Sequence, residues 1–500
     1  MKNRTLLAEY DYERAEVVKG YSGQTLYINL TDNTIEARPV TEQMKEIFIG
    51  GRGFGLWLLW NGIKAETKWD SPENEIIISS GPLGGTTTFP GSGKSLCVSI
   101  SPLTGSVVDS NVGGYFGPLL KFAGWDAIEI QGKAAKDVVV FIDGNKGRIT
   151  IEEAPGAPTD SYPVGEAALA MFADTEKEKR DISSVSAGTG ADHALFGCLN
   201  FSWYDVGRGR IRLKQAGRGG IGTVFRDKGI KALVVKQSGV NSDSNQPADR
   251  KRINRVGFKM NREMHDFDHL QCHMRTVGTA HLVEIMNDYD LLPTHNFRYG
   301  AHEDAHHLFS NHYLKEFNQD TVDGCWYGCT MACSKGIDGF ELRTGPYQGQ
   351  VVTVDGPEYE TLAGCGSNLG VFDRAWVAEY NYYCDTYGVD TISFGTGLAF
   401  VIECYEAGIL NQEITGGLEL MPGNAEAAAE LLHQMARGEG FGLIFGLGVR
   451  RMKEIFAREY GGDPAFLQDI GMEAKGMEYS EYVTKESLAM QGGYGLTLKG

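Results

Sequence analysis

Three cysteines lie close together in the segment Cys325-Trp326-Tyr327-Gly328-Cys329-Thr330-Met331-Ala332-Cys333. Thiolates in such a short run can bind one soft metal centre, and iron–sulfur clusters are held in this way. Structural zinc usually takes four nitrogen or sulfur ligands, often as two separate pairs, and no second pair accompanies this run. The spacing therefore favours an iron–sulfur cluster at Cys325, Cys329 and Cys333 over zinc or three unrelated buried cysteines.

Carboxylates follow the cysteine run in two places. Glu358 and Glu360 come directly after a Gly-Pro pair, and a carboxylate in such a glycine-rich, cysteine-adjacent segment is a candidate general base. Farther on, Asp385 and Asp390 flank Gly388 where one helix is expected to end. Negative charge is unfavourable at that end of a helix. Either the two carboxylates accept hydrogen bonds from a polar ligand, or the segment is a plain helix–turn–helix link.

Glycine-rich segments in the first half of the chain are candidate ligand loops. Gly93-Lys94-Ser95 is not a P-loop, because Thr88 stands where that motif needs its first glycine. The segment 217–222 satisfies G-x-G-x-x-G, but no clean strand is predicted before it and no acidic residue follows about 20 positions later. It favours a loop near some other phosphate, with a plain turn as the alternative. Asn111-Val112-Gly113-Gly114 is either a ligand loop or the entry to a helix.

Nine of the eleven histidines lie between residues 265 and 312, which makes this segment a further candidate site. His265, His269 and His273 are spaced i, i+4 and i+8, so they would share one face of a helix and could bind zinc or copper. A histidine-bearing helix face at a surface or an active-site entrance is the simpler explanation.

The composition is that of a globular protein with two to four domains, since 500 residues carry 42% hydrophobic and 22% charged side chains. A net charge of −18 disfavours nucleic acid and anionic membranes as partners. The charged N-terminal segment has no signal-peptide pattern, and no apolar run is long enough for a membrane span. Nine irregularly spaced cysteines indicate reduced thiols and a cytoplasmic location.

The elements that must position these residues change in type along the chain. Residues 1–19 read as a polar extension, and 20–240 as a β-rich domain with strands at 25–30, 34–38, 75–78, 96–100, 127–130 and 138–142. After a polar break, 248–500 is expected to be mainly helical, with helix-length segments at 248–288, 373–384, 391–407, 425–437 and 443–460. The predicted class is therefore α+β.

In their order along the chain, these segments resemble the tungstopterin-dependent aldehyde:ferredoxin oxidoreductase family over roughly residues 20–500. The resemblance rests on blocks at 50–53, 101–105, 109–117, 121–126, 216–222, 231–235, 292–294, 356–362, 385–390 and 403–410. It implies a β-rich base for the cofactor, followed by two mainly α-helical domains at 248–437 and 438–500. The second of these is expected to be truncated, because a second pterin motif and a fourth cluster cysteine lie beyond residue 500 in the family.

The resemblance also implies the cofactors and the residues that hold them. Tungsten would be held by two pterins, whose phosphates are joined by Mg²⁺ at Asn111 and the backbone of Ala216. A [4Fe–4S] cluster would lie on the cysteine run. Lys94 stands where the family usually has an arginine between pterin and cluster. The remaining implied cofactor-binding residues are Gly113, Gly217, Arg218, Asp385, Gly388 and Asp390.

Several positions depart from the family pattern. The cysteine run is C-x3-C-x3-C instead of C-x2-C-x3-C, with Trp326 where the first cysteine is expected. Glu360 falls on the active-site glutamate, and Glu473 falls where the family has an active-site histidine. Cys365 is unusual, since a cysteine in this region ligates tungsten in the benzoyl-coenzyme A reductase branch.

The implied activity is oxidation of a small aldehyde to a carboxylate, with Glu360 as base, Glu473 assisting, and electrons leaving to ferredoxin or partner subunits. A homodimer or hetero-oligomer is expected. Two alternatives stay open at this point: a low-potential reductase of an aromatic thioester or acid, and a non-catalytic iron–sulfur electron carrier.

Overall fold

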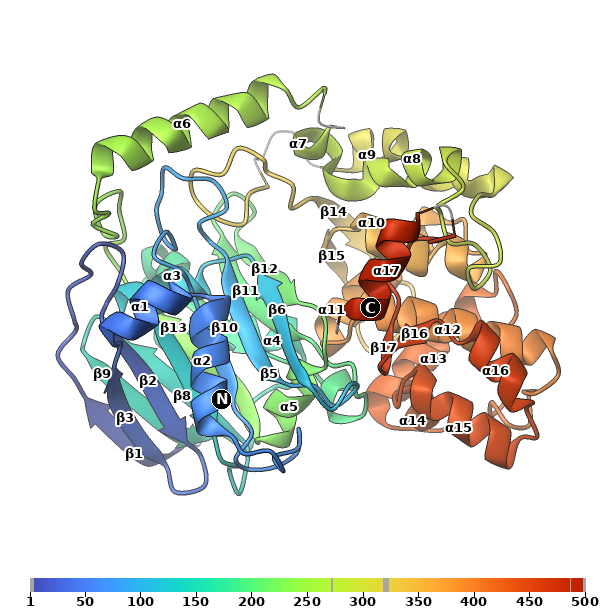
Figure 1. The fold of residues 1–500 in the computed structure, drawn as a ribbon, viewed down its shortest axis with the longest axis horizontal. Helices are drawn as coiled ribbons and strands as arrows, with labels where there is room; N and C mark the ends of the chain where they lie inside the picture. The colour runs from blue at the N-terminus through green and yellow to red at the C-terminus, as the bar shows by residue number, and fades with distance from the viewer. Residues whose placement is uncertain (1–3, 271–272, 318–322, 486, 498–500) are drawn as a thin grey trace. The chain divides into compact units, whose positions relative to one another are not determined.

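The computed structural model describes residues 4–270, 273–317, 323–485 and 487–497, and its chain forms two compact units (Figure 1). Each unit gathers segments that are far apart in sequence, and the boundary crosses the cysteine run after Met331. Unit 1 comprises Met1–Gly188, Gly197–Asp266 and Gly324–Met331; unit 2 comprises Thr189–Phe196, Phe267–Asp323 and Ala332–Gly500.

Unit 1 contains two large mixed sheets. The seven-stranded sheet has the order β1 (Thr5–Asp11), β9 (Arg148–Glu153), β8 (Val138–Asp143), β13 (Ile230–Lys236), β10 (Ile182–Ser186), β11 (Leu199–Asp205), β12 (Arg210–Ala216). The six-stranded sheet has the order β3 (Thr34–Pro39), β2 (Gln24–Asn29), β7 (Ala127–Gln131), β4 (Ile76–Ser79), β5 (Ser95–Ile100), β6 (Val107–Val112). Pairing is antiparallel except between β2 and β7 and between β8 and β13. All six strands expected from the sequence are present.

The helices of unit 1 cover and connect these sheets. Their bounds are α1 (Glu42–Phe48), α2 (Arg52–Gly62), α3 (Phe116–Phe122), α4 (Ser161–Phe172), η1 (Glu176–Asp181), α5 (Ile221–Asp227) and α6 (Arg250–Asp266). Helix α4 packs on β10, β11, β12 and β13, because Val164, Ala168 and Phe172 repeat at the spacing of one helix face. Helix α5 contacts strands of both sheets and is buried from Ile221 to Phe225.

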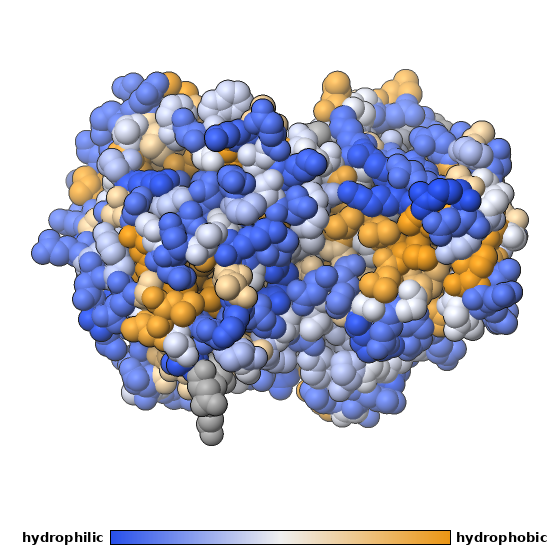
Figure 2. Space-filling view, turned by 90° about the horizontal axis from the view of Figure 1, so that it is seen from below, coloured by the Kyte–Doolittle hydropathy of each residue, from blue (hydrophilic) through white to orange (hydrophobic). Residues whose placement is uncertain are grey.

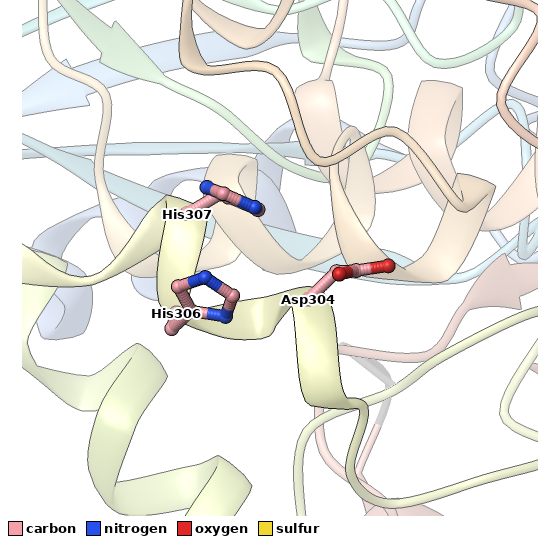
Figure 3. A group of neighbouring side chains, drawn as sticks. All are labelled: Asp304, His306 and His307. Atoms are coloured by element: carbon pink, nitrogen blue, oxygen red, sulfur yellow. The ribbon is translucent and has the colours of Figure 1, made fainter.

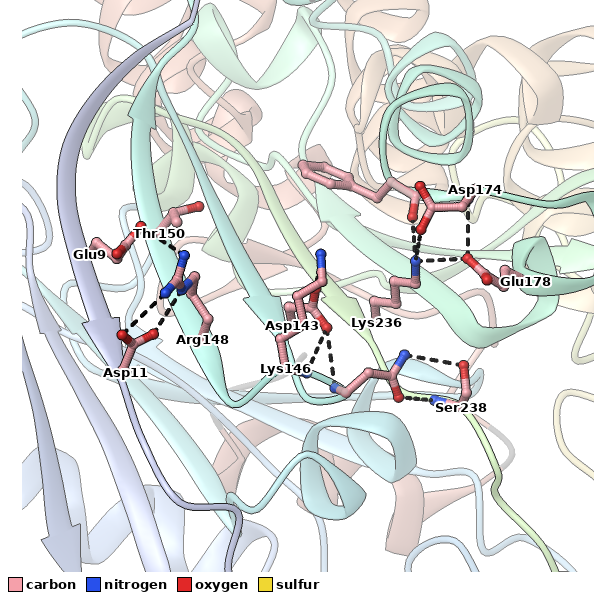
Figure 4. A network of polar contacts seen from close by, with 12 residues as sticks. Glu9, Asp11, Asp143, Lys146, Arg148, Thr150, Asp174, Glu178, Lys236 and Ser238 are labelled. Carbon is pink, nitrogen blue, oxygen red and sulfur yellow. Dashed lines mark hydrogen bonds and ion pairs between the residues drawn. The ribbon is translucent and has the colours of Figure 1, made fainter.

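The segment expected to be a polar extension instead supplies edge strand β1. It pairs antiparallel with β9, and ion pairs fix its register: Arg148 on β9 lies 2.7 Å from Asp11 and 3.4 Å from Glu9 (Figure 4). Lys236, the last residue of β13, forms ion pairs with Glu178 at 2.7 Å and with Asp174 at 3.2 Å. Strand β1 includes the apolar residues Leu6 and Leu7, but it is mostly exposed and shows no buried alternation, and for this reason its sequence did not reveal a strand.

Unit 2 is mainly helical, so the predicted α+β class is confirmed. Its elements are η2 (Gly190–Asp192), α7 (Met274–Val277), η3 (Gly278–His281), α8 (Leu282–Asp288), η4 (Glu303–Leu308), α9 (Ser310–Glu316), β14 (Gly336–Glu341), β15 (Val351–Asp355), α10 (Tyr359–Gly364), η5 (Ser367–Leu369), α11 (Arg374–Tyr387), α12 (Thr391–Glu406), α13 (Ala425–Arg437), α14 (Gly442–Phe445), α15 (Val449–Glu459), α16 (Pro464–Ile470), β16 (Glu473–Ala474), β17 (Met477–Glu478) and α17 (Leu488–Leu496). The domain boundaries drawn from the sequence stay predictions.

The prediction that three histidines share one face of a helix is wrong. Helix α6 carries His265 but ends at Asp266, His269 lies in a turn, and His273 has a left-handed backbone with φ 57° before α7. Left-handed backbone cannot continue an α-helix, so the i, i+4, i+8 spacing does not place the three rings together.

One face of the molecule is mostly polar (Figure 2). On the face drawn in Figure 2, hydrophilic side chains predominate and apolar ones gather in separate patches. Among the residues that the structure describes, none of the helices has the length and apolar character needed to cross a membrane.

Candidate functional site

The first part of the cysteine run packs against the loop between β4 and β5, residues 80–94. Trp326 is buried there, and its Nε1 donates to the carbonyl oxygen of Thr86 at 3.4 Å. Its ring packs on Tyr115 with 4.8 Å between ring centres, and a Cβ at Gly93 would overlap the Trp326 Cβ. Position 326 is thus occupied by a buried packing side chain.

Cys325 lies directly against Gly113, at the end of β6. A Cβ built on Gly113 would be 2.8 Å from the Cys325 Cβ and 2.9 Å from its Sγ, so only a glycine permits this approach without a shift. Thr330, just after Cys329, is anchored to α6, because its N–H and Oγ1 both bond to Asn261, at 3.0 Å and 2.7 Å. Cys325, Cys329 and Cys333 are all half-buried.

A buried lysine anchors the base of the same loop. The ammonium of Lys121 donates to the carbonyl oxygens of Gly81 at 2.7 Å and Gly84 at 2.8 Å. Burial lowers its pKa to about 7, against the raising effect of Asp126. The role of Lys121 in holding the loop is visible only in three dimensions, because its partners lie about 40 positions earlier in the chain.

Two of the predicted cofactor loops meet in unit 1. Lys94 and Asn111 are exposed on neighbouring strand ends, with Nζ 3.5 Å from Oδ1. The backbone N–H of Arg218 donates to Ser110 Oγ at 3.3 Å, which brings the Ala216–Arg218 turn beside the Asn111 end of β6. The fold thus gathers Lys94, Asn111, Gly113, Ala216, Gly217 and Arg218 around the end of β6.

The statement that no strand runs into the G-x-G-x-x-G segment is wrong, since β12 ends at Ala216. The motif nevertheless lacks the dinucleotide-binding context. Strand β12 leads through the glycines into α5 and then β13, but the antiparallel ladder β13–β10–β11–β12 makes β12 and β13 run in opposite directions. A dinucleotide-binding unit needs two parallel strands around its helix.

In unit 2 the D-x-x-G-x-D motif forms the corner between α11 and α12. Gly388 ends α11 in the left-handed conformation at φ 67°, and Asp390 caps α12 by accepting from the N–H of Ile392 at 3.0 Å. Asp385 is buried in the last turn of α11, where Asn381 Nδ2 donates to it at 3.1 Å. The helix–turn–helix link is therefore real, and a ligand-binding role for these three residues stays a prediction.

Glu360 lies in the first turn of α10, in a network with a segment far along the chain. Its Oε2 accepts from the backbone N–H of Glu481 at 2.9 Å, and the Tyr359 hydroxyl donates to the Glu481 carbonyl at 2.6 Å. Burial raises the pKa of Tyr482, and the adjacent Glu360 raises it further. Both tyrosines therefore stay protonated and can only stabilise, not deprotonate, a group beside Glu360.

Glu481 is a fully buried carboxylate that the sequence did not single out. Its Oε1 accepts from Thr396 at 2.7 Å and its Oε2 from Asn368 at 3.3 Å. Beside it, burial raises the pKa of the Cys365 thiol well above its usual range, and the charges of Glu481 and Asp390 add to the effect. Cys365 Sγ lies 3.6 Å from the Thr391 carbonyl oxygen. Nothing local marks Glu481, which is 121 residues from Glu360.

Glu473 lies in a different set of contacts from Glu360. On β16 it forms a salt bridge of 2.6 Å with Lys453, and its Oε2 accepts from the N–H of Gly476 at 2.7 Å. Both side chains of the pair are about one-tenth exposed. The carboxylate thus stabilises the β16–β17 hairpin, and its catalytic role stays a prediction.

Comparison with known proteins shows that the chain is similar to oxidoreductases. Residues 25–237 match the family model of the aldehyde ferredoxin oxidoreductase N-terminal domain, and residues 255–500 match that of domains 2 and 3. The tungsten-containing aldehyde ferredoxin oxidoreductase of Pyrococcus abyssi is 33% identical over 87% of this chain and 68% of that protein. The chain belongs to the aldehyde ferredoxin oxidoreductase family.

Other relatives differ in what their names say they act on. The aliphatic sulfonate oxidoreductase, WOR-like subunit, of Pyrococcus furiosus is 30% identical over 95% of this chain and 74% of that protein. Among solved structures, the active-site complex BamBC of benzoyl coenzyme A reductase with 1,5 dienoyl-CoA has a TM-score of 0.72 at 21% identity, covering 93% of this chain and 66% of that one. That last likeness is one of fold.

Proposed function

We propose that this protein is a tungstopterin oxidoreductase that oxidises a small aldehyde to a carboxylate and passes the electrons through a [4Fe–4S] cluster to ferredoxin or partner subunits. Family membership across both halves of the chain carries this proposal. An aldehyde is the substrate named for the P. abyssi relative, whereas a sulfonate is named for the WOR-like one. A cytoplasmic homodimer or hetero-oligomer belongs to the same proposal.

The residues present fit these groups. The sulfur atoms of Cys325, Cys329 and Cys333 are the soft donors that an iron–sulfur cluster takes. The Asn111 side chain and the Ala216 carbonyl are hard oxygen donors of the kind Mg²⁺ prefers. Lys94 lies beside Asn111 and adds positive charge for phosphate groups, although a lysine cannot form the two-pronged contact of an arginine.

When bound, the tungsten–pterin group supplies two-electron redox chemistry and Lewis acidity. The balanced conversion takes an aldehyde and one water to a carboxylate, releasing two electrons and three protons. Glu360 is the base that we assign to the first of these protons. The Glu481 N–H fixes one of its oxygens at 2.9 Å, which orients the carboxylate. Glu473 would assist while paired with Lys453.

The decisive variant is Glu360→Gln. The amide keeps an oxygen that can accept from the Glu481 N–H but cannot take up a proton, so aldehyde oxidation should fall by roughly 10²–10⁴-fold. The matched control is Glu358→Gln, because Glu358 is two residues away and bonds to Thr279 instead. Elemental analysis should find about one tungsten and about four irons per chain in all three proteins.

Four outcomes would reject parts of this proposal. Full activity of Glu360→Gln removes Glu360 as the base. Reduction of an aromatic thioester without aldehyde oxidation replaces the activity by that of a low-potential reductase. Iron without tungsten or pterin leaves only an electron carrier, and zinc alone rejects the cofactor assignment.

A further inference from the structure

A second group of metal-ligand side chains lies on η4, in the histidine-rich segment of unit 2. Asp304, His306 and His307 each present a ligand atom, and these atoms all lie within 4.8 Å of one another (Figure 3). The group contains none of the residues assigned above to pterin, Mg²⁺ or cluster. It is also distinct from the His265–His269–His273 series, whose expected common face does not form.

We propose that Asp304, His306 and His307 bind a divalent transition-metal ion, for which zinc is the best-suited candidate. Two imidazoles and one carboxylate are a ligand set that zinc takes with water in the remaining position. Zinc–ligand bonds of about 2.0–2.2 Å place tetrahedral donors roughly 3.4 Å apart, so ligand atoms that lie within 4.8 Å of one another must close by up to about 1.4 Å. Both histidines are exposed, with 4.0 Å between the centres of their rings.

The tautomer of His306 is already set for metal binding. Its Nδ1 lies 2.7 Å from the carbonyl oxygen of Glu303. A carbonyl can only accept, so Nδ1 carries the proton and Nε2 presents its lone pair. Metal-bound histidines are commonly oriented in this way, by donating the other ring nitrogen's proton to a backbone carbonyl.

The backbone that carries the three ligands is held at both ends. His302 Nδ1 accepts from the N–H of Asp304 at 3.1 Å, which caps the start of η4. At its other end, Arg374 donates to the His307 carbonyl at 3.2 Å, and the same guanidinium pairs with Glu316 at 3.0 Å. Binding therefore requires only side-chain rotation, which keeps its entropic cost small.

Solvent reaches the group. His307 lines a cavity of about 500 Å³, together with Glu316, Asp338, Phe372 and Arg374. Three protein ligands leave coordination positions open, and water from this cavity can fill them. The ion would stabilise η4 locally, since all its protein ligands come from this one short turn.

The test measures zinc on the full chain with its redox cofactors. Wild type, His306→Ala/His307→Ala and the control His265→Ala/His269→Ala are equilibrated with Zn²⁺ by dialysis, and zinc, tungsten and iron are counted by elemental analysis. Wild type and control should hold about one zinc per chain more than the His306/His307 variant. Equal tungsten and iron contents show that each protein is folded and that zinc has not replaced iron on the cysteines.

A second readout is the thermal unfolding midpoint with and without Zn²⁺. Zinc should raise the midpoint of wild type and of the control, because an ion that binds only the folded state stabilises it, and should leave that of the His306/His307 variant unchanged. Equal zinc content and equal shifts in wild type and the His306/His307 variant overturn the proposal. Loss of zinc from the control overturns it too. Neither result depends on which substrate the enzyme oxidises.

Discussion

Replacing Gly113 by alanine tests whether the fold positions Cys325 as the structure shows. The added methyl would lie 2.8 Å from the Cys325 Cβ and 2.9 Å from its Sγ, whereas ordinary contacts between carbon atoms are about 3.5–4.0 Å. Alanine suits the backbone of Gly113, which is not left-handed, so the whole effect comes from this overlap of about 0.7 Å. Overpacking of this kind costs about 1–3 kcal/mol.

The overlap can be relieved only if Cys325 moves away from the end of β6, so the cluster should suffer more than the fold. We expect Gly113→Ala to be purified with less iron per chain than wild type and to unfold at a lower temperature. The matched control is Gly81→Ala in the same unit, because a Cβ there meets no atom within 4 Å and the backbone is not left-handed. Iron content and the thermal midpoint are measured on all three proteins.

Wild-type iron content together with an unchanged midpoint in Gly113→Ala would refute the reasoning, since the methyl would then fit where the structure leaves no space. A lower thermal midpoint with the full iron content would confirm the contact between Gly113 and Cys325 but would show that Cys325 is not a cluster ligand. Equal losses in Gly81→Ala would show that any added methyl in this unit has the same effect.

Two further predictions concern buried charges. Burial, together with the charge of Glu129, raises the pKa of Glu75 to about 8. The unfolded chain therefore loses the proton of this carboxyl at a lower pH than the folded one, so wild type should lose stability relative to Glu75→Gln as the pH rises from about 4.5 to about 8. The loss should amount to up to about 1.4 kcal/mol per pH unit. Denaturant midpoints at both ends of this range measure it, and a pH-independent difference would contradict it. Lys453→Met should destabilise the protein by up to about 3 kcal/mol, because it removes the nearer of the two cations beside Glu473 and leaves only Arg450 at 3.9 Å. The double variant with Glu473→Gln should recover most of this loss, and a single variant as stable as wild type would contradict the prediction.

Elements with a regular pattern were predictable from the sequence. The alternation from Thr25 to Leu30 and the apolar run from Val138 to Ile142 became β2 and β8, because a strand repeats every two residues. The apolar spacing of 425–437 became α13 within the same bounds. Strand β1 was not predicted, since it is a mostly exposed edge strand without buried alternation. The predicted histidine helix did not form, since the sequence does not show that His273 adopts a left-handed backbone.

The sequence by itself determined the fold class, the family, and the residues whose spacing is local: the cysteine run, the corner at 385–390 and the glycine loops. Only the tertiary structure decided which of these meet. Gly113 contacts Cys325 across more than 200 residues, and Glu360 accepts its hydrogen bond from Glu481 across 121. Local patterns reflect the period of one backbone segment, whereas contacts between distant segments depend on the order of strands and helices in space. For that reason Glu481 became visible only once the chain was folded. The Asp304–His306–His307 group is local in the sequence, and the structure adds that η4 brings its ligand atoms within 4.8 Å of one another.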